Sequence, residues 1–292
     1  MKRDQETVTM RLPDWIKTKG FTGRHETRRT LRQYGLSTVC EEARCPNIGI
    51  CFSKPTAAFM ILGSSCTRNC GFCSVESSIA LPPDGGEPQR VAMAARDMGL
   101  RYVVVTSVTR DDLPDGGSSH FAETVRALRD NLPQALIEVL IPDFKGDGAA
   151  LGAVLSSGPD VLNHNVETVP RLYPLVRPQA DYKRSLTLLR NARAIAPSVP
   201  TKSGLMVGLG ETFQEVLSVM REIHDTGCHR LTIGQYLRPS KKNLPVAEYV
   251  LPEVFDRYRD AALGIGFKGV ASSPLVRSSM NAEEMFLAGE RF

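Results

Sequence analysis

An alternation of two kinds of apolar segment, which begins at Ala57, limits this chain to few folds. Short runs rich in β-branched residues alternate with stretches in which apolar residues recur at helical spacing. The runs that predict strands are AAFMIL, RYVVVTSV, ALIEVLI, DVLNHNV, KSGLMVGL, RLTIGQYL and, more weakly, FKGVAS. Repeated β-α units give parallel strands with helices packed outside them. We therefore predict an α/β fold of the partial (β/α)6-type TIM barrel kind, with a doubly wound sheet as the alternative.

The repeat covers only the middle of the chain, so we predict three regions. Residues 57–250 form the barrel, and residues 1–56 and 251–292 form N- and C-terminal extensions that lie over the barrel mouth. Barrels of this kind carry their chemistry at the C-terminal ends of the strands. Each predicted strand is followed there by polar residues or glycine, and we expect the functional site at this end.

Three cysteines lie within eight residues directly after the first predicted strand, in the stretch SSCTRNCGFCSV. Cys66, Cys70 and Cys73 have the spacing C-x3-C-x2-C. A structural zinc site uses four ligands, commonly as two close pairs, and this loop offers only three. Three thiolates instead suit a 4Fe-4S cluster that keeps one iron open to an external ligand. The spacing favours such a cluster over zinc or structural thiols.

A second trio of cysteines lies in the N-terminal extension, in the stretch VCEEARCPNIGIC. Cys40, Cys45 and Cys51 have the less specific spacing C-x4-C-x5-C, which favours metal binding over buried or redox thiols. Beside the first trio it indicates a second cluster. The seventh cysteine, Cys228, has no partner nearby in the sequence, and we expect it to be a small core residue.

Charge and hydropathy exclude several classes of protein. Residues 1–35 hold nine Lys or Arg against four Asp or Glu, which predicts either a solvated basic arm or a docking surface for an acidic partner. No recognisable nucleic-acid motif interleaves basic and aromatic residues. The apolar runs are far shorter than the roughly 20 residues of a membrane-spanning helix, and the N-terminal sequence lacks the apolar centre of a secretory signal. We therefore expect a cytoplasmic protein with no membrane or nucleic-acid partner, and cluster chemistry rather than disulfides.

Several further stretches occur together with the two trios: TSVTRDDLPDGGSSHF, NHNVETVPRLY, TKSGLMVGLGET, LTIGQYLRPS and PLVRSSM. With these motifs the chain resembles the lipoyl synthases of the radical S-adenosylmethionine (SAM) superfamily, from about residue 10 to the end. The resemblance implies a sulfurtransferase that inserts two sulfur atoms at the sixth and eighth carbons of a protein-bound octanoyl chain. It also implies two 4Fe-4S clusters and SAM as cofactors.

The resemblance assigns a role to each trio. Cys66, Cys70 and Cys73 are implied to hold the SAM-cleaving cluster, and Cys40, Cys45 and Cys51 the auxiliary cluster that is consumed as sulfur donor. The family completes the auxiliary cluster with a serine of an R-S-S-Y motif, so Ser279 is expected to be its ligand and a catalytic residue, with Ser278 as the second choice. Met280 departs from the family tyrosine and lacks its phenolic hydrogen-bond donor.

Other polar residues and glycines near the strand ends are weaker candidates for contact with SAM or the substrate. Asn163, Asn165 and Glu167 alternate along one predicted strand and share a face, although they also suit hydrogen bonding within the protein. The segment GLGE permits close backbone approach. Arg110, Asp111 and Asp112 fit a salt-bridge cluster as well as an active-site mouth. The expected cofactor-binding set is Phe72, Thr106, Asn163, Asn165, Glu167, Gly208, Gly210 and Glu211.

The resemblance also implies partners. These are octanoylated lipoyl carrier domains, namely acyltransferase subunits of 2-oxoacid dehydrogenases and the glycine cleavage H protein, together with a ferredoxin- or flavodoxin-type reductant and an iron-sulfur carrier that rebuilds the cluster. Two alternatives remain: another two-cluster radical SAM enzyme, whose auxiliary cluster would survive turnover, and an iron-sulfur electron-transfer protein.

Overall fold

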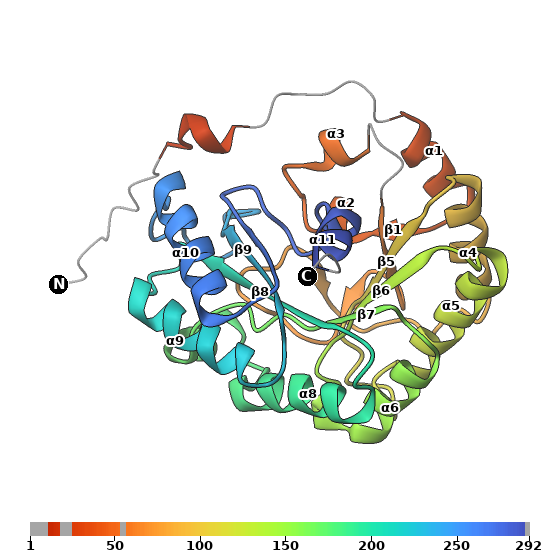
Figure 1. Cartoon of the computed structure of the whole chain (residues 1–292). Helices are drawn as coiled ribbons and strands as arrows, with labels where there is room; N and C mark the ends of the chain where they lie inside the picture. Colours follow the sequence, from red (N-terminus) through yellow and green to blue (C-terminus); the bar gives the residue numbers. More distant parts are fainter. Residues whose placement is uncertain (1–10, 18–24, 53–56, 290–292) are drawn as a thin grey trace.

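A computed structural model describes residues 11–17, 25–52 and 57–289 (Figure 1). Much of the basic arm predicted in residues 1–35 therefore lies outside the described residues. The boundaries of the three regions remain a prediction. One strand from each extension joins the central sheet.

The centre of the molecule is an eight-stranded sheet in which all neighbours from β2 to β10 are parallel. All seven predicted strands are present, and the short strand β1 adds to the edge beside β2 in the antiparallel sense. In sheet order the strands are β1 (Ser37–Thr38), β2 (Ala58–Ile61), β5 (Tyr102–Ser107), β6 (Leu136–Leu140), β7 (Val161–Asn163), β8 (Thr201–Val207), β9 (Arg230–Gln235) and β10 (Gly269–Ser272). A separate two-stranded sheet pairs β3 (Ser65–Cys66) with β4 (Glu76–Ser77).

The larger helices lie along the outer side of the curved sheet (Figure 1). They are α4 (Glu87–Asp97), α5 (Ser118–Asn131), α6 (Gly148–Ser156), α8 (Tyr182–Ile195), α9 (Phe213–His224) and α10 (Pro252–Ile265). Local sequence sets their starts: Asp181 caps α8, and Thr212 with Glu215 forms a capping box on α9. Helices on one side of a curved parallel sheet confirm the partial barrel over the doubly wound alternative.

The remaining helices belong to the extensions and to loops. The N-terminal extension contributes η1 (Asp14–Ile16), α1 (His25–Gln33), α2 (Val39–Glu42) and α3 (Ile48–Cys51), and the C-terminal extension ends in α11 (Ala282–Gly289). Short turns η2 (Phe144–Gly146), η3 (Pro170–Leu172) and α7 (Tyr173–Val176) follow strands β6 and β7. Within the described part of the chain, none of these helices has the length and apolar character that crossing a membrane requires.

Two apolar clusters hold the sheet and its helices together. Strand residues such as Ile61 and Val105 belong to the first cluster, and Val207 and Ile233 belong to the second. All four are inaccessible to solvent. Full burial of such a side chain contributes about 1.5–3 kcal/mol, so the paired strands form a rigid base for the loops at their ends.

The C-terminal extension runs along the inside of the barrel. A Cβ atom at Gly234 would lie 2.2 Å from the carbonyl oxygen of Val276, so only glycine lets the chain pass this close. Further on, the ring of Phe286 in α11 packs against Tyr102 of β5 and under the guanidinium of Arg230 in β9. Figure 1 shows α11 between the two edges of the sheet. The extension thus passes the strand interior and reaches the ends at which the strands begin.

Candidate functional site

The loop that carries Cys66, Cys70 and Cys73 leaves β2 through a tight turn. Leu62 and Gly63 both have positive φ, of 68° and 86°. The amide of Leu62 donates a 2.8 Å hydrogen bond to the carboxylate of Glu87, which also lies 2.7 Å from Nε2 of His120. Two helices therefore hold the point at which the strand turns into the cysteine loop.

Segments that follow other strands hold the rest of this loop. The amide of Thr67 donates to the carbonyl of Thr109 at 3.0 Å, after β5. The amide of Gly71 donates to the carbonyl of Val176 at 2.9 Å, and the carbonyl of Gly71 accepts from the amide of Leu244 at 2.9 Å. The cysteine loop is thus fixed by backbone hydrogen bonds to three different strand connections.

Arg68, which lies between the first two cysteines, is the centre of a buried ion-pair network. Its guanidinium forms two hydrogen bonds to Asp111, of 2.7 and 2.9 Å, and two to Asp143, of 3.1 and 2.7 Å. Asp143 also accepts a 3.3 Å hydrogen bond from Arg184. Burial alone would raise the pKa of Asp143, but the hydrogen bonds and charge of Arg68 outweigh it and hold the pKa at about 2. Bidentate pairs of this kind orient the loop as well as stabilise it.

The variant Asp143→Asn is expected to lower the free energy of unfolding by about 3 kcal/mol at neutral pH, because it leaves the buried charge of Arg68 with one carboxylate instead of two. Since the folded-state pKa lies below the unfolded value of about 3.9, the contribution of Asp143 is present above about pH 4 and is lost as the pH falls towards 2. Urea unfolding at several pH values measures this: the two chains should differ least in acid.

Asp256→Asn is the matched control, because Asp256 pairs with Arg259 at the surface. Its cost should stay below about 1 kcal/mol. An Asp143→Asn chain as stable as this control would contradict a structural role for the network.

The three thiols of the first trio influence one another. Burial, together with the nearby Cys70 and Cys66, raises the pKa of Cys73 to about 12, against a hydrogen bond from the amide of Val75. Burial likewise raises the pKa of Cys70, against the positive charge of Arg177. Thiolates in such a place need a strong positive partner, which cluster iron would supply, so the donor set fits an iron-sulfur cluster.

The geometry of the thiols also bears on the kind of metal. Among the described residues, no three His, Cys, Asp or Glu side chains converge on one position where a single metal ion would sit. In a 4Fe-4S cluster each thiolate binds a different iron, so the sulfur atoms need not converge on one point. Three thiols placed in this way are compatible with a 4Fe-4S cluster.

A cation and a carboxylate that are mostly buried lie beside the first trio. Arg177 donates to the carbonyl of Asn165 at 3.1 Å and to the hydroxyl of Tyr173 at 3.1 Å, and its charge acts on Cys70. Glu167 has a left-handed backbone conformation, with φ of 73°, and its charge raises the pKa of Cys70. Burial in turn raises the pKa of the Glu167 carboxyl. Sequence reasoning named Glu167 but missed Arg177, because nothing in the stretch VRPQ marks an arginine as buried.

The second trio lies on two short helices of the N-terminal extension and on the turn between them. Cys40 is in α2, Cys51 ends α3, and the amide of Cys45 donates to the carbonyl of Cys40 at 3.0 Å. Burial, together with the charges of Cys45 and Cys51, raises the pKa of Cys40 to about 12. The three thiols are therefore close together, in an environment that again fits iron-bound thiolates.

The C-terminal extension lies against this second trio. The side-chain amide of Asn47 donates to the carbonyl of Leu275 at 2.6 Å and contacts the sulfur of Met280 at 3.2 Å. Ser279 and Cys51 line one cavity of about 360 Å³. Met280 thus holds the buried Asn47 where the resembled family has tyrosine.

The two candidate serines point to different neighbours. The hydroxyl of Ser278 exchanges hydrogen bonds of 2.8 and 3.1 Å with the side-chain amide of Asn165. Ser279 faces the cavity that it shares with Cys51. Ser278 is thus hydrogen-bonded to Asn165, whereas Ser279 lines the same cavity as Cys51 of the second trio.

Several predicted cofactor contacts are already engaged within the protein. Asn163 donates at 3.0 Å to Glu138, which also accepts from Lys202 at 2.9 Å and from the hydroxyl of Tyr102 at 2.6 Å. All but Tyr102 are buried inside the barrel, and the side-chain oxygen of Asn163 has no partner among the described residues. The hydroxyl of Thr106 donates to the carbonyl of Leu140 at 3.0 Å.

The segment GLGE forms a self-supporting turn after β8. The carboxylate of Glu211 accepts hydrogen bonds from the amides of Gly208 and Leu209, and Gly208 and Gly210 have φ of 99° and 104°. A Cβ at Gly208 would lie 2.1 Å from the side-chain nitrogen of Gln235. Side chains of the protein therefore fill the space that this glycine leaves.

Two other sequence candidates also have structural neighbours. Phe72 packs against the second apolar cluster. Asp112 pairs with the buried Arg110 at 2.8 Å, so the charged stretch after β5 is an ion-pair cluster, in which Asp111 holds the cysteine loop through Arg68.

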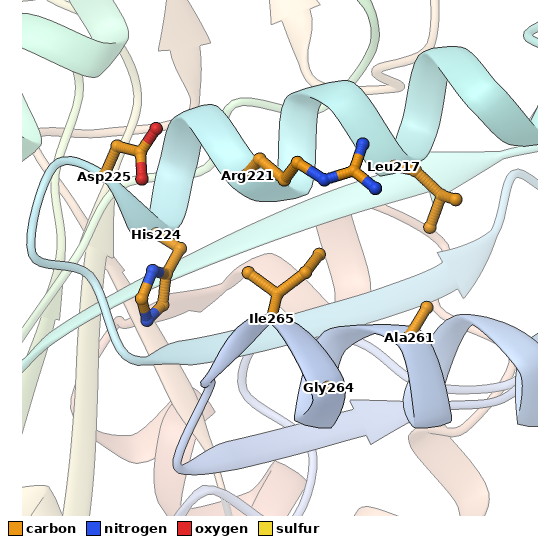
Figure 2. A pocket seen from close by; sticks show the side chains of 7 residues that line it. All are labelled: Leu217, Arg221, His224, Asp225, Ala261, Gly264 and Ile265. Atoms are coloured by element: carbon orange, nitrogen blue, oxygen red, sulfur yellow. The ribbon is translucent and has the colours of Figure 1, made fainter.

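A second cavity, of about 510 Å³, lies between α9 and α10 on the outside of the barrel (Figure 2). Its lining residues are Leu217, Arg221, His224, Asp225, Ala261, Gly264 and Ile265. It contains no thiol and is lined by neither cysteine loop, so the chemistry of the two trios lies elsewhere.

Comparison with known proteins shows which families this chain resembles. Residues 60–223 match the radical SAM superfamily, and residues 1–45 match the N-terminal domain of lipoyl synthase of the radical SAM family. A lipoyl synthase of Caldanaerobacter subterraneus is 55% identical over 94% of this chain and 97% of its own length. A lipoyl synthase of Haemophilus influenzae is 52% identical over 96% of this chain and 89% of its own length.

Solved structures resemble this chain in fold. HydG, a maturase of the FeFe hydrogenase, aligns with a TM-score of 0.58 at 14% identity, over 94% of this chain and 61% of that one. Methylornithine synthase aligns with a TM-score of 0.54 at 15% identity, over 94% of this chain and 82% of that one. At such identities the likeness supports the partial barrel and nothing more specific.

Proposed function

Because this chain belongs to the lipoyl synthase family of the radical SAM superfamily, we propose that it inserts two sulfur atoms into an octanoyl chain carried on a lysine of another protein. The expected positions are the sixth and eighth carbons. One observation supports this: residues that follow β7 lie near elements of both candidate sites. Glu167 acts on Cys70, and Asn165, two residues earlier, holds Ser278 next to Ser279.

The two trios divide the work. Cys66, Cys70 and Cys73 would hold the cluster that binds SAM, and Cys40, Cys45 and Cys51 with Ser279 would hold the auxiliary cluster. When bound, the first cluster and SAM supply a carbon-centred radical and the auxiliary cluster supplies sulfur. A serine oxygen in place of a fourth thiolate leaves one iron more weakly held, which suits a cluster that is dismantled in use.

The task of the protein is therefore mainly positioning. The reacting methylene must lie between the two trios. The hydrogen-bonded side chains of Asn165 and Ser278 also lie between them. Arg177 and Glu167 set the charge beside Cys70. The buried group of Glu138, Lys202 and Asn163 braces β6, β7 and β8 beneath these residues.

The partners follow from the same proposal. The substrate is an octanoylated carrier domain, such as an acyltransferase subunit of a 2-oxoacid dehydrogenase or the glycine cleavage H protein. A ferredoxin- or flavodoxin-type protein supplies electrons, and an iron-sulfur carrier refills the auxiliary site. We place the reaction in the cytoplasm, because six cluster-binding thiols need a compartment that keeps them reduced.

The test is anaerobic incubation of the reconstituted protein with SAM, dithionite and an octanoyl-lysine peptide. Mass spectrometry should show the peptide with two added sulfur atoms, and iron should be released from the auxiliary site as sulfur is transferred. A peptide without sulfur, from protein that holds both clusters, would overturn the proposal. Sulfur-free turnover with an intact auxiliary cluster would favour another two-cluster radical SAM enzyme.

A further inference from the structure

Four exposed basic side chains lie together where the two cysteine loops meet the surface. They are Arg44, Arg238, Lys241 and Lys242, and we call them the basic rim. Arg44 lies between Cys40 and Cys45 in the N-terminal extension, and the other three belong to the connection between β9 and α10. Residues far apart in the sequence thus contribute to one positively charged surface.

The basic rim is contiguous and held in shape. The guanidinium of Arg44 lies 3.5 Å from the carbonyl oxygen of Pro239, which brings the two segments into contact. Arg238 donates to the carbonyls of Lys241 at 2.6 Å and of Asn243 at 2.8 Å, so it braces its own loop. A surface that is ordered before a partner arrives loses less entropy on binding.

The charges of the basic rim are not neutralised locally. No carboxylate within the described ranges comes within 4.0 Å of any of these four side chains. Arg68, by contrast, is fully occupied by two aspartates. Grouped cations without counter-charges attract an acidic partner and speed its association.

The loop that carries three residues of the basic rim contacts the first cysteine loop, and Arg44 lies in the second. The side-chain amide of Asn243 donates to the carbonyl of Cys73 at 2.6 Å, and the amide of Leu244 donates to Gly71 at 2.9 Å. Arg44 precedes Cys45 directly. A protein seated on the basic rim would therefore contact the edges of both candidate cluster sites.

We propose that the basic rim docks an acidic protein surface that flanks the octanoyl-lysine of the carrier domain. This inference rests on the proposed function and adds the surface by which the substrate protein is recognised. The acyl chain must reach between both trios, and the basic rim borders both. A reductant needs access to the first cluster alone, so the carrier domain fits this position better.

The test is the double variant Lys241→Glu/Lys242→Glu in otherwise intact, reconstituted protein. The concentration of carrier domain that gives half the maximal single-turnover rate should rise roughly tenfold at low salt, with the maximal rate nearly unchanged. At about 0.5 M salt the difference should largely disappear, because the charges are then screened. With a short uncharged octanoyl-lysine peptide the variant should match the parent.

The matched control is Lys183→Glu/Lys268→Glu, which changes the net charge equally at two exposed lysines on α8 and at the start of β10. An effect of the first variant no larger than that of the control would overturn the docking proposal. So would a defect that appears only when a protein reductant replaces dithionite, which would assign the surface to the reductant. If the parent protein modifies neither peptide nor carrier domain, the proposed function itself fails, and the docking proposal with it.

Discussion

Replacement of Cys70 by alanine is expected to reduce both 5′-deoxyadenosine formation and sulfur insertion to the level of protein-free controls. Cys70 is one of the three thiols that we assign to the SAM-binding cluster, whose fourth iron has no cysteine ligand. Loss of Cys70 would leave a second iron without a protein ligand. The auxiliary trio belongs to the N-terminal extension, outside the loop that carries Cys70, so about half of the iron should remain bound. Chromatography of the SAM products, with iron analysis, measures each effect.

Cys228→Ala is the matched control for loss of a thiol. Cys228 is fully buried, and its sulfur lies 3.4 Å from the carbonyl of Thr201 and 3.5 Å from that of Arg230, within the second apolar cluster. This variant should lose stability by about 1 kcal/mol and keep both activities. Normal SAM cleavage by the Cys70→Ala protein would contradict the assignment of the first trio.

The strands of this fold were predictable because their burial is local and regular. Runs such as YVVVTS and LIEVL consist mostly of apolar or β-branched residues. The path of the C-terminal extension was not predictable in the same way, because it depends on Gly204 and Gly234 leaving space inside distant strands. Nothing near Phe286 in the sequence shows that its ring meets Tyr102 and Arg230.

The site was predictable to the extent that its ligands are neighbours in the sequence. Each cysteine trio falls within a short stretch of sequence. The spacing of the first trio indicated a cluster, and the second trio indicated another when considered beside the first. The residues that position the loops were missed, because Arg68 finds Asp143 only after the barrel has formed. Lys202 likewise meets its buried partner Glu138 only in the folded barrel.

Internal partners also change how the weaker candidates are understood. A polar residue at a strand end hydrogen-bonds to another group of the protein as easily as to a ligand, and the sequence alone does not distinguish these two roles. Glu211 closes its own glycine turn, and the amide nitrogen of Asn163 is taken by Glu138. Asn165 and Glu167 remain the best placed of this group, because they lie between the tail serines and the first trio.

Replacement of Cys45 by alanine is expected to abolish sulfur insertion while 5′-deoxyadenosine formation continues. Cys45 belongs to the trio that we assign to the sulfur-donating cluster, whereas SAM would bind at the other loop, which has backbone hydrogen bonds to three strand connections. Mass spectrometry of the octanoyl peptide should show no added sulfur. SAM cleavage should persist within roughly tenfold of the parent rate, since its own ligands are untouched.

The comparison of Cys45→Ala with Cys70→Ala separates the roles of the two trios. If the trios divide the work as proposed, Cys45→Ala stops only sulfur insertion, whereas Cys70→Ala stops both SAM cleavage and sulfur insertion. Loss of SAM cleavage in a folded Cys45→Ala protein that retains its first cluster would mean that the division is wrong. Circular dichroism and iron content of both variants exclude unfolding as the cause.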